Sequence, residues 1–319
     1  MKKIFSSLFS SNKDNSNNIE KEKRKNFDIL KYDGVRAQKI GKLAYAAKCF
    51  TEAIAIQEDF ETMSYLVGTY SMAHENDKAL EVLDRMKEIE PTHINTMFTR
   101  VSVLFLLNRE EDVIAECRNI IELDSQSNVA YFLLGKAKKT LNNSDDALTD
   151  LTNAISLKSD LADPYLLRAE IYFEKGDGQS AIADIDKVLE LEGDEEAAFL
   201  LRAMTCELLN NNDEAEHNYK QVLDLNPFNE KAGLKLAQLF IANNRFDEAM
   251  TLLDEIIDIV PFSANIYAER SKLRNTLGDS AGAESDMKTA NELLEADEDA
   301  TSKNGAQGGF NDMYKGGIY

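Results

Sequence analysis

Apolar side chains along most of the chain follow the spacing of amphipathic helices. In residues 162–195, Tyr165, Ala169 and Tyr172 recur at intervals of four and three, which places them on one face of a helix. A second stripe of the same kind follows over residues 181–191. The pattern therefore predicts two helices joined by a short turn within this window.

The two-helix pattern repeats every 34 residues. Aligning the chain with itself at this period gives a mid-window column of small residues, Ala79, Val113, Ala147, Ala181, Ala215, Ala249 and Ala283, with Ala46 one residue out of step. A second column is branched aliphatic in all eight windows: Ile56, Ile89, Leu123, Leu157, Leu191, Leu225, Ile259 and Leu293. A third column is mostly small: Gly34, Val67, Val101, Gly135, Ala169, Ala203, Ala237 and Ser271. Because these columns agree over residues 27–297, we interpret the chain as a series of internal repeats.

The residues between the two stripes are of the kind that end one helix and begin the next. Gly176 suits the left-handed conformation that ends many helices, and asparagine is the next best choice. Other windows have asparagine at this place: Asn142-Asn143, Asn210-Asn211-Asn212 and Asn243-Asn244. Residues expected to open the second helices follow, where they can cap exposed amides and meet the positive end of the helix dipole: Asp145, Ser180, Asp213 and Asp247. Pro91, Pro227 and Pro261 come just after second helices, where the chain must stop being helical.

A 34-residue helix–turn–helix with an early aromatic residue, a small residue, a central alanine and a late proline resembles the tetratricopeptide repeat. The early aromatic residues are Tyr131, Tyr165, Phe199 and Tyr267. The resemblance covers eight windows: 27–59, 60–93, 94–127, 128–161, 162–195, 196–229, 230–263 and 264–297. It implies an all-α, right-handed superhelical solenoid with a concave face lined mainly by first helices. Such a fold offers a binding surface, and function must be read from the residues that line it.

Family geometry places thirteen residues on the concave face: Phe98, Phe105, Phe132, Lys136, Lys139, Leu166, Glu170, Phe173, Leu200, Met204, Lys235, Gln238 and Ile241. Four of them are phenylalanines from three consecutive windows, which favours a groove for an amphipathic helix or an extended apolar segment of a partner protein. The alternative is that several rings pack sideways between neighbouring first helices. The sequence leaves both open.

Two further interpretations concern charged residues of the repeats. Heat-shock co-chaperones of this family bind a carboxylate through Lys, Asn and Arg at set positions; Lys31 matches, but Val35, Tyr65 and Thr99 do not, so we expect no such clamp. A column of arginines faces a column of mostly acidic residues: Arg100, Arg168, Arg202 and Arg270 against Glu116, Asp184, Asn218 and Asp286. These arginines could form an anion site, but internal pairing is favoured because a buried guanidinium needs a partner.

Both terminal segments depart from the repeat. Residues 1–26 contain seven Lys or Arg and three Asp or Glu, and we expect a basic, largely disordered segment. As a helix, Ile4, Phe5, Leu8 and Phe9 would share a face, which would allow weak membrane contact. Residues 298–319 are rich in glycine and aromatic residues, and no polar closing helix is expected after Ala296. This tail could be solvated or mediate self-association, or its apolar residues could cover the last hairpin or occupy a groove: Phe310, Met313, Tyr314, Ile318 and Tyr319.

Composition narrows the function further. The chain has 36 Lys and Arg against 57 Asp and Glu, a formal charge of −21, which disfavours nucleic acid as a partner. Cys49, Cys117 and Cys206 have no paired spacing and are predicted to be buried free thiols in a reducing compartment. The sequence has no HExxH, GxxxxGK[ST], GxGxxG or GxSxG motif, so we expect no catalysis, metal or cofactor.

We therefore interpret the chain as a cytoplasmic, non-enzymatic scaffold that binds an apolar or basic segment of another protein in the concave groove. The alternative function is a peripheral membrane adaptor, anchored by residues 1–10, that organises an envelope complex. A third is a structural protein that associates with itself.

Overall fold

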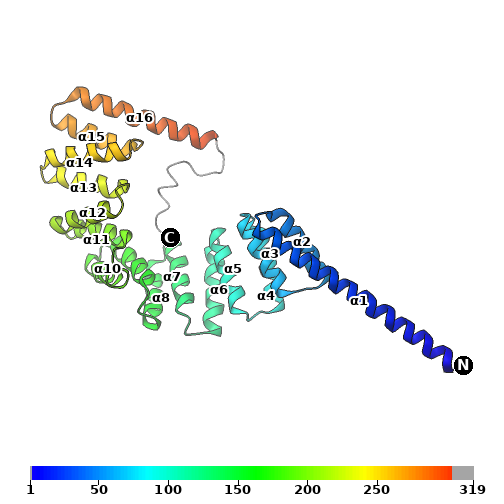
Figure 1. Cartoon of the computed structure of the whole chain (residues 1–319). Helices are drawn as coiled ribbons and strands as arrows, with labels where there is room; N and C mark the ends of the chain where they lie inside the picture. Colours follow the sequence, from blue (N-terminus) through cyan, green and yellow to red (C-terminus); the bar gives the residue numbers. More distant parts are fainter. Residues whose placement is uncertain (1, 304–319) are drawn as a thin grey trace. The chain divides into compact units, whose positions relative to one another are not determined.

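The computed structural model describes residues 2–303, and the side chains of residues 20–296, as an all-α protein without a β-strand. First and second helices alternate along the chain (Figure 1). The first helices are α1 (Lys2–Lys39), α3 (Phe60–Met72), α5 (Ile94–Leu106), α7 (Asn128–Thr140), α9 (Ala162–Glu174), α11 (Glu196–Leu208), α13 (Glu230–Ala242) and α15 (Ala264–Thr276). The second helices are α2 (Leu43–Ile56), α4 (Asn76–Ile89), α6 (Glu110–Leu123), α8 (Ser144–Leu157), α10 (Gly178–Glu192), α12 (Asn212–Leu225), α14 (Phe246–Ile259) and α16 (Ser280–Lys303).

Each first helix from α3 to α15 begins on the first residue of a 34-residue sequence window. The residue immediately before the helix explains this regularity. In six of these seven helices its side chain accepts a hydrogen bond from the backbone N–H three positions later: Asp59, His93, Ser127, Glu195, Asn229 and Ser263. Leu161 occupies the same position before α9 and makes no such bond. The alignment of the repeats did not identify this column, although side-chain acceptors at a fixed spacing are visible in the sequence.

The turn between first and second helices contains one residue with positive φ in every repeat. Gly176 has φ of 79°, and Asn142, Asn210 and Asn244 have φ between 57° and 59°, so the predicted use of asparagine in place of glycine is confirmed. His74 and Asn108 adopt the same conformation and were not identified from the sequence. Because glycine, asparagine and histidine all adopt positive φ at this position, the turn requires the left-handed conformation and not glycine itself.

The residues predicted to open the second helices lie in the first turn as expected, but their predicted capping role is wrong. Asp177, Asn211 and Asp279 are the side chains that accept from backbone N–H groups, at Ser180, Glu214 and Gly282 respectively. Asp145, Ser180, Asp213 and Asp247 lie inside the first turn, where the carboxylates of the three aspartates interact with the positive end of the helix dipole. The left-handed turn residue places the cap directly after itself, earlier than the sequence suggested.

The helices form two compact units, residues 1–157 (unit 1) and residues 158–319 (unit 2). In each unit, consecutive helices pack side by side (Figure 1). The small-residue columns lie where helices approach closely, because a Cβ on Gly34 would come within 2.6 Å of Phe50 and one on Gly135 within 2.9 Å of Leu151. The central alanine column is at most 2% exposed. The small columns therefore mark helix contacts, as the repeat pattern implied.

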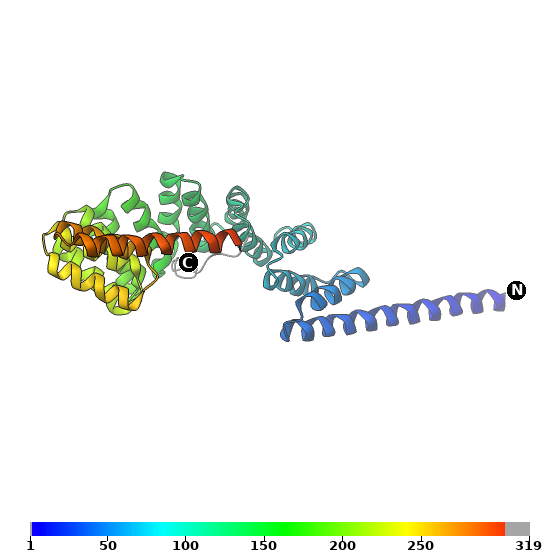
Figure 2. The same cartoon turned by 90° about the horizontal axis from the view of Figure 1, so that it is seen from above.

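The terminal helices are longer than expected. The structure has a helix from Lys2, where the sequence led us to expect disorder over residues 1–26; no glycine or proline precedes Gly34. In two perpendicular views, the amino-terminal part of α1 extends beyond the other helices of unit 1 (Figure 2). The last helix continues past Ala296 to Lys303, so part of the predicted tail is helical. The apolar tail residues from Phe310 onward lie outside the described residues.

Candidate partner-binding surface

Five of the predicted groove residues lie on α5 and α7 of unit 1, and we call them the first-helix surface of unit 1: Phe98, Phe105, Phe132, Lys136 and Lys139. All five are half-buried. Phe98 and Phe105 pack against the core of unit 1. The Lys136 Nζ lies 5.6 Å from the centroid of the Phe105 ring, a cation–π distance that joins two consecutive first helices. The rings are thus partly used in packing and partly accessible.

The other eight predicted residues lie on α9, α11 and α13 and form the first-helix surface of unit 2: Leu166, Glu170, Phe173, Leu200, Met204, Lys235, Gln238 and Ile241. Leu200 is only 7% exposed and belongs to the core of unit 2. Met204 and Ile241 are half-buried and pack against that core. The remaining five are also half-buried. The apolar residues of α11 and α13 in this set therefore contribute to packing between helices.

Glu207 connects three helices at the edge of the unit 2 surface, and sequence reasoning missed it. Its carboxylate accepts a hydrogen bond of 2.7 Å from the Tyr219 hydroxyl of α12. The Lys235 Nζ of α13 lies 3.9 Å from the same carboxylate. Burial and the hydrogen bond to Glu207 raise the pKa of Tyr219 well above its usual range, so the phenol stays neutral and donates. This part of the surface is held in place by internal polar contacts.

The arginine column forms internal ion pairs. Arg168 binds Asp184 through two hydrogen bonds of 2.7 and 2.8 Å, and Arg270 binds Asp286 through two of 2.7 and 2.9 Å. Arg100 Nη1 lies 3.2 Å from Glu116. Hydrogen bonding to the partner carboxylate raises the pKa of Arg168 and of Arg270. The pairing interpretation is therefore confirmed in these three repeats, each pair joining a first helix to its second helix.

Arg202 is the exception in this column, because Asn218 stands where the other repeats have an acid. The Arg202 Nε and the buried Asn218 Oδ1 both lack a hydrogen-bond partner. Arg202 instead reaches the exposed Asp186 at 3.4 Å. Buried polar atoms without hydrogen-bond partners reduce stability. This repeat therefore lacks the ion pair between first and second helix that the other three repeats contain.

We expect Asn218→Asp to raise the free energy of unfolding by about 1 kcal/mol near neutral pH, because it supplies the carboxylate that Arg202 lacks. A carboxyl paired in this way has a lowered pKa in the folded state. The gain is therefore complete above the unfolded-state pKa of about 4 and disappears as the pH falls below it. Urea denaturation at several pH values measures the effect. The same substitution in an Arg202→Ala background serves as the control, and a gain that persists there would contradict the pairing.

Lys31, the one residue that matched the carboxylate clamp, already has partners within the chain. Its Nζ lies 2.8 Å from Asp59 and 2.6 Å from Glu61. Burial opposes the charge of Lys31, but hydrogen bonds to these two carboxylates leave its pKa raised. Its ammonium group is therefore engaged by acids that precede and begin α3.

Two tetratricopeptide repeat family descriptions match the chain, over residues 132–198 and residues 209–273. The chain is a tetratricopeptide repeat protein. Repeat proteins of this kind serve in general as scaffolds for protein–protein interaction, without catalysis. No curated protein matches the chain significantly.

Several solved structures have a similar fold, and one of them, YrrB, is described as a tetratricopeptide repeat protein. YrrB, described as having an unusual peptide-binding site, is 16% identical, with a TM-score of 0.47, and the match covers 56% of this chain and 91% of YrrB. MamA from Desulfovibrio magneticus RS-1 is 17% identical (TM-score 0.48; 52% of this chain and 95% of MamA). Yeast Tom70 is 17% identical (TM-score 0.48; 85% of this chain and 77% of Tom70). Similarity at this level concerns the repeat fold alone.

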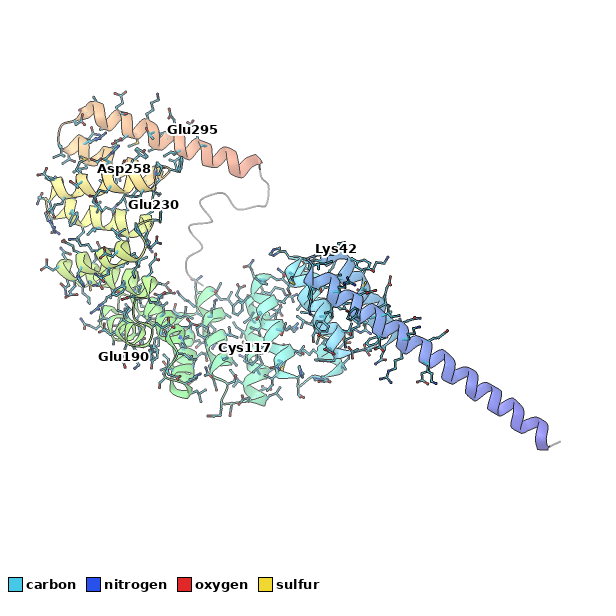
Figure 3. All side chains as sticks on the ribbon, viewed as in Figure 1. Lys42, Cys117, Glu190, Glu230, Asp258 and Glu295 are labelled. Carbon is cyan, nitrogen blue, oxygen red and sulfur yellow. The ribbon has the colours of Figure 1, made fainter. Side chains whose placement is uncertain are left out.

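The described residues of this tetratricopeptide repeat protein contain no group of three or more His, Cys, Asp or Glu that could hold a metal ion. No described helix is both long enough and apolar enough to cross a bilayer. The three cysteines are buried free thiols, as predicted; Cys117 is labelled on α6 in Figure 3. Burial, with smaller contributions from the carboxylates of Glu116 and Asp150, raises the pKa of Cys117 to about 12. The thiol is therefore a poor nucleophile.

We expect Cys117 to resist alkylation in the folded tetratricopeptide repeat protein. A pKa of about 12 leaves roughly a thousandfold less thiolate at pH 8 than in the unfolded chain, and burial adds a steric barrier. Mass spectrometry after iodoacetamide treatment, with and without urea, measures the difference. Cys117 modified at similar rates in both states would show that the core around α6 opens readily.

Exposed apolar residues also occur where sequence reasoning did not place a site. Phe228 and Phe262 are exposed in the loops after α12 and α14, each following a proline, Pro227 and Pro261. The repeated Pro-Phe pair was visible in the sequence at the 34-residue spacing. These two rings lie outside the predicted groove and provide matched controls for it.

Proposed function

We propose that this protein is a non-catalytic scaffold that binds an apolar or basic segment of another protein on the first-helix surface of unit 1. The observation that carries the proposal is the arrangement of half-buried rings on α5 and α7, with Lys136 joined to Phe105 across the two helices. An amphipathic helix or an extended apolar segment could cover the accessible part of these rings. The first-helix surface of unit 2, which contains Phe173 of α9, extends the set of candidate contacts.

The charge of the chain supports a basic partner. With a formal charge of −21, the protein attracts positively charged segments over a distance of about one Debye length and repels nucleic acid. Affinity that falls with salt indicates that charge drives encounter, whereas affinity that is nearly independent of salt indicates that the phenylalanines dominate. We also propose that the protein acts in the cytoplasm. Its three buried cysteines are free thiols, and a reducing compartment keeps thiols in this state.

The test uses the full chain and a peptide array of basic and neutral amphipathic helices, followed by fluorescence anisotropy on the peptides that bind. Phe98→Ala and Phe132→Ala together are expected to weaken binding at least about tenfold, since aromatic residues carry much of the energy of such contacts. Phe228→Ala and Phe262→Ala together form the control with the same change of composition. Binding that is lost in the control and kept in the first variant would contradict the proposed surface.

The membrane adaptor alternative rests on the helix that begins at Lys2, because a helical segment is what an interfacial anchor requires. The side chains of Ile4, Phe5, Leu8 and Phe9 lie outside the described residues. Flotation with anionic vesicles, comparing the full chain with a chain that lacks residues 1–26, decides between the two functions. Equal behaviour of the two chains removes the anchor and leaves the scaffold.

A further inference from the structure

The outer face of α1 is uncovered at a position that the other repeats bury. Ile29 is 48% exposed. In the six first helices that follow another repeat of the same unit, the residue in this register is at most 4% exposed: Thr62, Thr96, Ala130, Ala198, Ala232 and Ile266. The face of α1 that carries Ile29 is therefore the face against which a preceding repeat packs.

The last hairpin has the complementary uncovered face. Met287 of α16 is 39% exposed. In the six second helices that precede another repeat of the same unit, the equivalent residue is at most 1% exposed: Phe50, Leu83, Cys117, Ile185, Tyr219 and Leu253. In unit 2, Met287 lines an open cleft of 540 Å³ between α15 and α16, together with Glu284, Glu292 and Glu295. This cleft is where the first helix of a following repeat would pack.

The two terminal helices are also extended in matching directions. α1 has 38 residues and α16 has 24, whereas the other helices have 13 to 15. The additional length of α1 lies at its amino end, and that of α16 at its carboxyl end. A second helix and the first helix of the next repeat are joined by a short loop and pack antiparallel, so these two ends would lie beside each other if α1 packed on α16.

The charges of the two extensions are opposite. Residues 20–26 contain four basic and two acidic residues, and residues 292–299 contain five acidic residues and no basic one. Lys21, Arg24 and Lys25 lie on the same exposed face of α1 as Ile29. Glu295 is labelled on α16, in the cleft-lining set with Met287 (Figure 3). The tail, residues 304–319, has one acidic and one basic residue and offers no such complement.

We propose that copies of this chain associate head to tail, with α1 of one copy packed antiparallel on the α15–α16 face of the next. In this arrangement α1 acts as the first helix of a following repeat, buries Ile29 and Met287, and places Lys21, Arg24 and Lys25 beside the acidic end of α16. The contact joins two different surfaces, so it continues from copy to copy instead of stopping at a dimer. An interface of one helix on one hairpin is small, which suggests a dissociation constant on the order of 1–100 µM.

Sedimentation velocity of the full chain over a concentration series tests the proposal. The average mass of the wild-type chain is expected to rise with concentration and to fall with added salt. Arg24→Glu with Lys25→Glu, and separately Glu292→Lys with Glu295→Lys, are each expected to weaken association at least about tenfold, because like charges then face each other. Lys158→Glu with Lys231→Glu is the control. It changes the net charge by the same amount as the first variant, but at sites away from both proposed contact faces.

Mixing the two charge-reversed variants gives the decisive measurement. Opposite charges face each other again in the mixture, so association is expected to return although neither variant associates alone. Loss of function through misfolding cannot produce this rescue. Association abolished by only one of the two charge reversals would overturn the proposal in favour of a contact between identical surfaces. A chain that is monomeric at all concentrations would overturn the proposal. Association that occurs only after deletion of residues 304–319 would also overturn it, since the tail would then cover the α15–α16 face.

Discussion

We expect Asp184→Leu to lower the free energy of unfolding by about 3–5 kcal/mol, because it leaves the guanidinium of Arg168 without its bidentate partner. The side chains of Arg168 and Asp184 are only 16% and 8% exposed. Water can therefore replace little of the lost interaction. Chemical denaturation followed by circular dichroism measures the loss, and hydrogen exchange of α9 and α10 shows whether it is local to this hairpin.

The double variant Arg168→Leu with Asp184→Leu provides the control. Another repeat of the same chain already has leucine at both equivalent positions. In the repeat that begins with α13, the two equivalent positions hold Leu236, which is buried, and Leu252, which packs against the core of unit 2. An apolar pair thus fits between a first and a second helix of this chain. We expect the double variant to recover most of the stability lost in the single one. A double variant as unstable as Asp184→Leu would show that the cost comes from the leucine at position 184 and not from the unpaired charge.

The helical repeat could be predicted from the sequence because its determinants are local. An apolar stripe fixes the buried face of a helix, and a left-handed residue fixes the turn, so both are visible within a dozen residues. The features that the sequence did not predict are those whose local signal is weak or misleading. His74 has the φ of a turn glycine, but histidine does not signal this conformation in a sequence. The sequence does not indicate the long α1, because a basic, polar composition is typical of disordered segments; the structure forms a helix there, since no glycine or proline interrupts residues 2–33.

The candidate surfaces could be predicted only in part, because exposure depends on which helix lies next to a residue. Phe98 and Leu200 are both apolar residues of first helices, yet Phe98 is half-buried and Leu200 belongs to the core. Ile29 and Met287 show the same effect more clearly. Each stands at a repeat position that the other repeats bury, and only the absence of a neighbouring helix among the described residues leaves it exposed. Sequence columns identify positions of contact, but the ends of a stack have to be seen in the structure.

The central alanine column gives the second large expected effect. Ala181 is fully buried on α10. Ala181→Leu adds three carbon atoms at this close contact between helices, and we expect it to lower the free energy of unfolding by about 1–3 kcal/mol, since overpacking displaces neighbouring side chains or the backbone. Thermal and chemical denaturation of the full chain measure the loss.

Ala183→Leu is the matched control, because it makes the same substitution on the same helix at an exposed position two residues away. Alanine and leucine have similar helix propensity, so the control is expected to change stability by no more than about 0.5 kcal/mol. The difference between the two variants then isolates the packing of α10 from its propensity to be helical. Equal stability of the two variants would mean that the central alanine column does not lie at a close contact between helices, and the register of the repeats would have to be revised with it.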